Sequence, residues 1–319
     1  MTERVTEQAG SPPALRAVVV GEALVDVVHH SDGSVSEHPG GSPLNVAYGL
    51  ARLGADVVLV TRLGDDEHGA AVRAHLGSAG VRLPDGAVDD GSTSLAHAHL
   101  DAEGRATYEF DLEWALPPVE LPGDADVLHT GSIATALQPG AGAVRALLES
   151  ARGRVPVTFD PNVRAAFLPE PAQAREQVEQ VVALSDVVKA SDEDLAWLAP
   201  GEDVVDVARS WAALGPALVV VTRGGEGAVG VTAAGALHEE PAPRIDVVDT
   251  VGAGDAFMSG LLDALALEGV LGAGAGRLRD LDGDALRRVV ARAIRSASST
   301  CTRAGANPPT REQLDAFGS

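Results

Sequence analysis

The chain has 319 residues, of which 45% are hydrophobic and 3% aromatic, and this length suits one large α/β domain or two ordinary ones. Its formal net charge of −22 argues against a nucleic acid or an anionic membrane as a partner, because both attract a basic surface. The only cysteine, Cys301, excludes an intrachain disulfide and a thiolate metal cluster.

The first 14 residues lack the apolar segment of a signal peptide and are expected to form a disordered tail. No later run approaches the roughly 20 apolar residues that span a bilayer. These features predict a cytoplasmic protein.

Beyond the tail, short β-branched runs alternate with helical stretches. Strands are expected at 17–20, 57–60, 157–159, 186–189 and 217–222, and helices near 43–53, 67–79, 171–184, 203–214, 253–267 and 284–302. Apolar strands separated by amphipathic helices indicate a mostly parallel sheet covered on both faces. No linker divides the chain, so we expect a single α/β domain over 15–319.

Two stretches, 27–41 and 93–115, interrupt this rhythm with alternating residues around Asp-Gly and Glu-Gly turns. Such patterns are typical of antiparallel hairpins. We expect them to form a small sheet that stands off the main domain and acts as a lid.

Polar residues follow the expected strands at Asp26 and in the segments 160–164, 189–194, 222–227 and 249–255. Ligands of an open parallel sheet gather outside the carboxyl ends of its strands. The five groups are therefore predicted to line one crevice.

The segment DTVGAGD, 249–255, precedes a long apolar helical run. Gly252 and Gly254 allow a sharp turn whose N–H groups form an anion nest, and the helix N-terminus adds its positive dipole end. Asp255 at this nest is either a base that accepts a proton from an attacking hydroxyl or an N-cap of the helix.

Competing phosphate motifs are absent from the sequence. Lys189 is the only lysine and no glycine precedes it, which excludes a Walker A loop. The dinucleotide fingerprint also fails at 249–261, because Phe257 occupies the third glycine position. An NAD-dependent oxidoreductase is therefore disfavoured.

The segments GGSPLNVAYGLARLG (40–54) and RLGDDEHG (62–69) resemble the first signature of the ribokinase-like (PfkB) carbohydrate kinase family, and DTVGAGDAFMSGLL (249–262) resembles its second. The resemblance covers nearly the whole chain and implies a three-layer α/β/α fold with a β lid. It also implies that Asp255 is the catalytic base, and that the amides of Gly252, Ala253 and Gly254 hold the transferred phosphoryl group.

The resemblance implies a sugar site and carries its residues over one by one. The residues assigned to it are Asp26, Gly40, Gly41, Asn45, Arg164 and Phe110. Asn45 as a helix-terminus polar group, Arg164 as a surface arginine, and packing of Phe110 and Tyr108 within the lid stay open as alternatives.

The resemblance also implies sites for ATP and metal ions. The residues assigned to ATP are Lys189, Ser191, Thr222, Gly224, Gly227 and Gly305. Ser191 and Asp194 replace the asparagine and glutamate of the family's N-x-x-E, so Asp194 is expected to reach Mg²⁺ only through water. A potassium ion is compatible with Asp249 and the Val251 carbonyl.

The sequence is therefore identified as an ATP-dependent carbohydrate kinase with fructose as the favoured acceptor. A 2-keto-3-deoxygluconate kinase or another sugar or nucleoside kinase of the family is the nearest alternative. A catalytically silent sugar- or nucleotide-binding protein is the non-enzyme alternative. The partners expected are a small sugar and ATP, with neither nucleic acid nor membrane, and a homodimer through the lid is compatible with the family.

Overall fold

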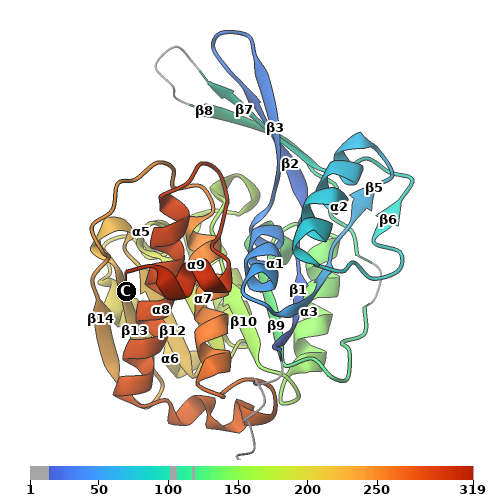
Figure 1. Ribbon diagram of the computed structural model, residues 1–319. Helices are drawn as coiled ribbons and strands as arrows, with labels where there is room; N and C mark the ends of the chain where they lie inside the picture. The colour runs from blue at the N-terminus through green and yellow to red at the C-terminus, as the bar shows by residue number, and fades with distance from the viewer. Residues whose placement is uncertain (1–13, 101–105, 117–118, 319) are drawn as a thin grey trace, which may run out of the picture.

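The structure, a computed structural model, describes residues 14–100, 106–116 and 119–318 (Figure 1). The tail expected over 1–14 lies outside the described residues except for Ala14.

An eight-stranded sheet forms the centre of the molecule, in the order β14-β13-β12-β11-β10-β9-β1-β4. All neighbours from β12 through to β4 are parallel, and β13 and β14 add an antiparallel edge. The strands are β1 (Arg16–Val20), β4 (Asp56–Val60), β9 (Val127–Gly131), β10 (Val157–Asp160), β11 (Val187–Ser191), β12 (Leu218–Thr222), β13 (Ala228–Thr232) and β14 (Leu237–Glu240).

Helices cover both faces of this sheet. One face carries α1 (Ser42–Arg52), α7 (Ala253–Leu267) and α8 (Gly283–Cys301). The other carries α3 (Gly140–Ala151), α4 (Pro171–Val182), α5 (Asp192–Leu198) and α6 (Val204–Leu214). Two more helices, α2 (Glu67–Ala79) and α9 (Arg311–Ala316), pack against α1 and α8 respectively. The predicted three-layer α/β/α fold is confirmed.

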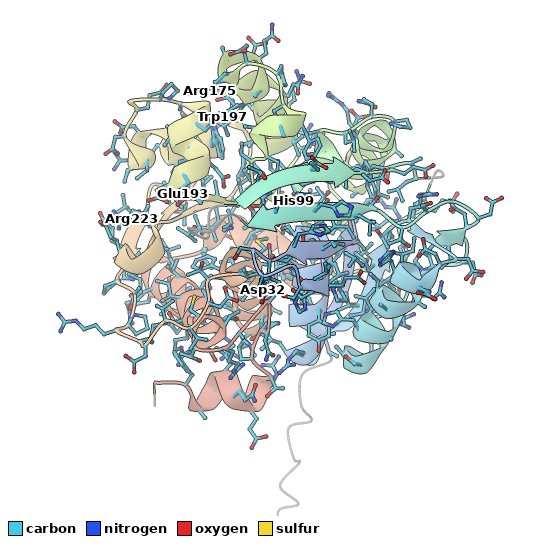
Figure 2. The ribbon with its side chains drawn as sticks, turned by 90° about the horizontal axis from the view of Figure 1, so that it is seen from above. Asp32, His99, Arg175, Glu193, Trp197 and Arg223 are labelled. Carbon is cyan, nitrogen blue, oxygen red and sulfur yellow. The ribbon has the colours of Figure 1, made fainter. Side chains whose placement is uncertain are left out.

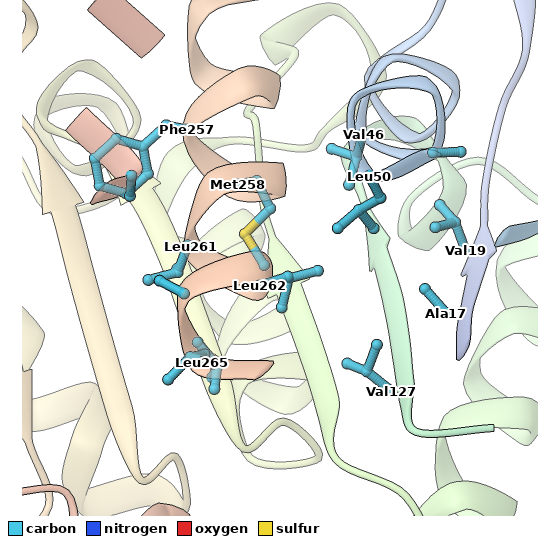
Figure 3. Close-up of a cluster of buried hydrophobic side chains, with 14 of the residues drawn as sticks. Ala17, Val19, Val46, Leu50, Val127, Phe257, Met258, Leu261, Leu262 and Leu265 are labelled. Atoms are coloured by element: carbon cyan, nitrogen blue, oxygen red, sulfur yellow. The ribbon is translucent and has the colours of Figure 1, made fainter. Parts of the chain in front are cut away.

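Alternating side chains of the buried strands supply the two cores. In β1, Val19 packs into the cluster that includes Met258 and Leu262 of α7, whereas Val18 and Val20 face the cluster that includes α3. Figure 3 shows the α7 side, where the helix lies against α1 and the ends of β1 and β9. Strands apolar on both faces explain why the sequence runs are continuously hydrophobic.

Helix caps agree with the sequence pattern. The side chains of Asp66, Asp203 and Asp282 accept hydrogen bonds from the first turns of α2, α6 and α8. Gly80 ends α2 in the left-handed conformation, with φ of 85°.

A small four-stranded sheet stands above the main body (Figure 1). Its strands are β3 (Val35–Gly40), β2 (Leu24–His29), β7 (Leu95–Leu100) and β8 (Ala106–Asp111), in that order. The two hairpins are antiparallel, as predicted, and β2 pairs with β7 in parallel. We refer to these four strands as the small sheet. A further pair, β5 (Leu63–Gly64) and β6 (Val88–Asp89), lies near α2.

Two details of the sequence prediction are wrong. The small sheet begins at Leu24 rather than 27, so Asp26 lies inside β2 instead of following a strand of the main sheet. Residues 112–115 lie beyond the small sheet, and Trp114 is buried in the main body, where its indole N–H donates to the Ala134 carbonyl. The apolar indole surface packs better in that core than on an exposed hairpin.

Candidate active site

The turn before α7 has the geometry of an anion cradle. Gly252 adopts a φ of 73°, and a Cβ at this position would lie 2.6 Å from the Ala306 Cβ, so only glycine fits. Within the described ranges, the N–H groups of Gly254 and Asp255 donate to no protein acceptor. Ala253 donates to the Thr250 carbonyl at 3.2 Å and would have to exchange this bond to hold a phosphoryl group. Free amides and the helix dipole thus meet at one point.

Asp255 lies in the first turn of α7 and is buried, with 9% of its surface exposed. Its Oδ1 accepts a hydrogen bond from Ser42 Oγ at 2.6 Å, and its Oδ2 accepts one from Asn45 Nδ2 at 2.8 Å. The N-cap of α7 is Gly252, and the Asp255 side chain does not cap the helix. The N-cap alternative is therefore wrong. The carboxylate is instead oriented by two hydrogen bonds from α1.

Close approach of α1 and α7 brings these three residues together. A Cβ at Gly49 would lie 2.6 Å from Ser259 Oγ, so the glycine allows the two helices to touch. Ser42 and Asn45 occupy the first turn of α1, which faces the first turn of α7. The close packing that Gly49 allows thus brings Ser42 and Asn45 within hydrogen-bond distance of Asp255.

Asp26 projects from β2 toward the junction of the small sheet and α1. A Cβ at Gly40 would lie 2.1 Å from Asp26 Oδ2, which explains the glycine. Burial raises the pKa of Asp26 above its ordinary value, the charges of His38 and Arg164 oppose this, and Asp255 adds to it. No hydrogen bond to the Asp26 carboxylate occurs in the described part of the chain, which leaves its oxygens available to hydroxyl donors.

Arg164, in the segment after β10, and Phe110, on β8, lie near the same region. The Arg164 guanidinium is exposed and donates to Asn162 Oδ1 at 2.8 Å, while its charge acts on Asp26. Phe110 of β8 is 38% exposed and meets the Phe167 ring edge-on at 4.9 Å, which joins the small sheet to the segment after β10. The Tyr108 side chain lies outside the described residues. The geometry is thus compatible with Arg164 as a surface arginine and with Phe110 as a packing residue of the lid.

A buried ion pair lies beneath the cradle. Lys189 Nζ donates to Asp160 Oδ2 at 2.8 Å, and the two side chains are 5% and 0% exposed. A Cβ at Gly254 would lie 3.0 Å from the same Nζ, so the ammonium group lies beside this residue of the cradle. Burial would lower the pKa of Lys189, but the charges of Asp160, Asp194 and Asp255 outweigh it and raise that pKa. The lysine therefore stays charged at the base of the cradle.

The residues assigned to ATP lie in the last part of β11, at the end of β12, in the loop after β12 and in the segment after α8. Gly224 and Gly227 have φ of 49° and 104°, and a Cβ at Gly227 would meet the Glu240 carbonyl at 2.0 Å. Thr222 ends β12 and donates to the Ala190 carbonyl. Seen from above, Glu193 and Arg223, which flank these loops, lie to one side of the small sheet strand that carries His99 (Figure 2).

Asp249 connects the turn before α7 to the segment after α8. Its carboxylate accepts N–H bonds from Val251 at 3.0 Å and from Gly305 at 2.8 Å. The Val251 bond, helped by that of Gly305 against the effect of burial, holds the pKa of Asp249 below its ordinary value. This ionised carboxylate fits a nearby monovalent cation.

Ser191 and Asp194 form a capping box at the start of α5. The two Asp194 oxygens accept backbone N–H bonds from Ser191 and Val163, and the residue is 7% exposed. Mg²⁺ usually keeps several waters and takes few protein ligands. Because both Asp194 oxygens already accept N–H bonds, this carboxylate fits contact with Mg²⁺ through water rather than direct coordination of the ion. No cluster of three or more His, Cys, Asp or Glu suited to a metal occurs among the described residues.

Sequence reasoning missed two residues of this site. Ser42 bonds the candidate base directly, although the sequence SPLN suggested only a helix start. Glu22 is buried, and the charges of Arg164 and Asp255 act on its carboxyl group. Its position two residues after an apolar strand was the available signal.

In the described ranges, no single helix is long and apolar enough to cross a membrane. Only the pair formed by α7 and the 3₁₀ segment Gly272–Asp280 reaches that length and composition together, and it is bent by 95°.

Comparison with known proteins agrees with this geometry. The model of the pfkB family carbohydrate kinases matches residues 14–313. A fructokinase of Klebsiella pneumoniae is 37% identical over 79% of this chain and 85% of its own length. A fructokinase of Xylella fastidiosa with bound ATP has a TM-score of 0.83 at 26% identity, covering 95% of this chain and 97% of that one.

A third relative is a double-mutant fructokinase of Vibrio cholerae O395 in a form that binds fructose, ADP and a potassium ion. It has a TM-score of 0.81 at 27% identity and covers 97% of this chain and 100% of that one. The family match spans nearly all of the chain and includes both glycine-rich segments that form the site. The chain therefore belongs to the pfkB family of carbohydrate kinases.

Proposed function

We propose that this protein is an ATP-dependent fructokinase that transfers the γ-phosphoryl group of ATP to a hydroxyl of fructose. The observation that carries the proposal is Asp255, a buried carboxylate fixed by Ser42 and Asn45 beside the free amides at the start of α7. Fructose is preferred because the relatives named above are fructokinases.

In the proposed reaction, Asp255 accepts the proton of the attacking hydroxyl. The bonds from Ser42 and Asn45 keep its oxygens oriented, so little reorganisation is needed when the proton moves. The free amides of the cradle and the ammonium of Lys189 face the charge that develops on the phosphoryl oxygens. Mg²⁺ on the triphosphate would neutralise part of this charge, and Asp194 is the residue proposed to hold its waters.

The remaining assignments belong to the same proposal. The acceptor sugar would contact Asp26, Gly40, Gly41, Asn45, Arg164 and Phe110. ATP would contact Ser191, Thr222, Gly224, Gly227 and Gly305, with Gly252, Ala253 and Gly254 around its γ-phosphoryl group. Asp249 and the Val251 carbonyl are proposed to hold a potassium ion.

The small sheet is proposed to act as a lid over the acceptor, within the single domain expected over 15–319. Its edge strand β3, half of whose residues are exposed, is also proposed to provide a surface for a homodimer in the cytoplasm. Light scattering after gel filtration would test the dimer, and a monomer at micromolar concentration would contradict it.

The direct test measures ADP release with purified protein and fructose, ribose, 2-keto-3-deoxygluconate or adenosine as acceptor. The highest kcat/KM is expected with fructose. Best turnover of adenosine would refute the sugar assignment, and best turnover of 2-keto-3-deoxygluconate would replace fructose. Tight binding of ATP without transfer to any acceptor would favour a silent binding protein.

A further inference from the structure

Glu22 lies where the small sheet joins the main body. It belongs to the three-residue link between β1 and β2, and Gly41 forms the second link, between β3 and α1. The two links touch, since a Cβ at Gly41 would lie 2.7 Å from the Glu22 carbonyl oxygen. Gly41 has a φ of 106° and is followed directly by Ser42. The Glu22 link therefore supports the turn from which α1 starts.

The Glu22 side chain is enclosed without a full set of partners. The residue is 5% exposed, and Oε2 has no hydrogen-bond partner among the residues that the structure describes. The groups that act on the carboxyl from other elements are the Ser132 hydroxyl after β9, Arg164 after β10 and Asp255 on α7. An ionised carboxylate at this point would be desolvated and repelled by Asp255. The Glu22 backbone N–H, the Ser132 hydroxyl and the exposed Arg164 offset this only in part.

We propose that Glu22 is a positioning residue which supports phosphoryl transfer only in its uncharged form, because it holds the junction that carries Ser42 and Asn45 to Asp255. Ionisation would draw water to the buried carboxyl and loosen the contact with Gly41. The bonds of α1 to Asp255 would then lose their alignment. This inference rests on the proposed kinase function.

The pKa of Glu22 determines the pH range in which the enzyme is expected to be active. Burial raises the pKa of Glu22 to about 8, and the repulsion of Asp255 adds to this while Ser132 and Arg164 oppose it. The neutral form therefore predominates below about pH 8. Above that pH, a single ionisation lowers the active fraction about tenfold per pH unit.

The first test is the pH dependence of kcat between pH 6 and 10 for the wild type, Glu22→Gln and Glu37→Gln. Glutamine is permanently neutral, so the alkaline fall should move upward by at least one pH unit in Glu22→Gln. Glu37, an exposed glutamate of β3 whose side chain is 52% exposed, is the matched control and should leave the profile unchanged. An identical alkaline fall in the wild type and in Glu22→Gln would overturn the inference.

The second test needs no substrate. Because the folded pKa of Glu22 lies above the unfolded value near 4.5, the wild type should lose stability as the pH rises from about 4.5 to 8. The Tm of Glu22→Gln should equal that of the wild type near pH 4.5 and exceed it by a growing margin up to pH 8. A constant Tm difference, or a Glu22→Gln protein that does not fold, would overturn the inference.

The two tests separate the two proposals. If no acceptor is phosphorylated at any pH, the proposed function fails, whereas the Tm comparison still decides whether Glu22 is buried in its neutral form.

Discussion

Replacement of Lys189 by methionine separates structural from catalytic roles of the buried ion pair. The variant would leave Asp160, which is 0% exposed, without its 2.8 Å partner. Breaking a buried pair from one side typically costs 3–5 kcal/mol, roughly a third or more of the stability of an ordinary domain. The loss should shrink at acid pH, because protonated Asp160 no longer carries an unpaired charge.

The double variant Lys189→Met, Asp160→Asn removes both charges and should recover most of this stability. Its kcat should nevertheless remain about 10²- to 10³-fold below the wild type, because the positive charge beside Gly254 is lost. Urea denaturation and ADP release measure the two quantities on the same samples. Arg288→Met, which breaks a surface pair with Glu268, is the control and should change the free energy of unfolding far less. A double variant with restored stability and wild-type kcat would refute the catalytic role of Lys189.

Two further variants probe the acceptor side of the site. Ser42→Ala removes the 2.6 Å bond to Asp255, and a hydrogen bond to a charged group is worth about 1.5–3 kcal/mol, so kcat should fall roughly 10- to 100-fold. An unchanged kcat in single-turnover measurements would contradict the orienting role of Ser42. Gly40→Ala forces the Asp26 carboxylate aside, so KM for the sugar should rise about tenfold or more, with a smaller change in kcat. Gly77→Ala, whose Cβ would meet nothing within 4 Å, is the control, and an equal KM in both variants would exclude Asp26 as a sugar ligand.

Much of the main sheet was predictable from sequence because its strands are apolar on both faces. The expected strands at 57–60 and 217–222 differ from β4 and β12 by a single residue at one end. β9 escaped prediction because His129 and Thr130 interrupt its apolar run. His129 Nδ1 pairs with Thr158 Oγ1 and Thr130 Oγ1 donates to the Val20 carbonyl, partners that sequence periodicity cannot reveal. α3 was missed as well, since it starts with Gly-Ala-Gly, which resembles a loop.

The part of the site that lies within one continuous segment, 249–255, was predictable from sequence. The turn and helix start around Asp255 are local, so the cradle followed from glycine spacing and the helix that comes next. Contacts between distant segments were not predictable in the same way. Ser42 and Asp255 are separated by 213 residues, and Lys189 and Asp160 by 29, so only packing of the helices and strands brings each pair together. The groups that act on the Glu22 carboxyl likewise come from three other segments.

The central claim is that Asp255 takes the proton from the acceptor hydroxyl. Its most direct test is kcat of Asp255→Asn together with ATP affinity by titration calorimetry, with Asp284→Asn, an exposed aspartate of α8, as the control. The account predicts that kcat falls by about 10³-fold or more while the Kd for ATP stays within about threefold. A kcat within tenfold of the wild type, with ATP still bound, would contradict the account.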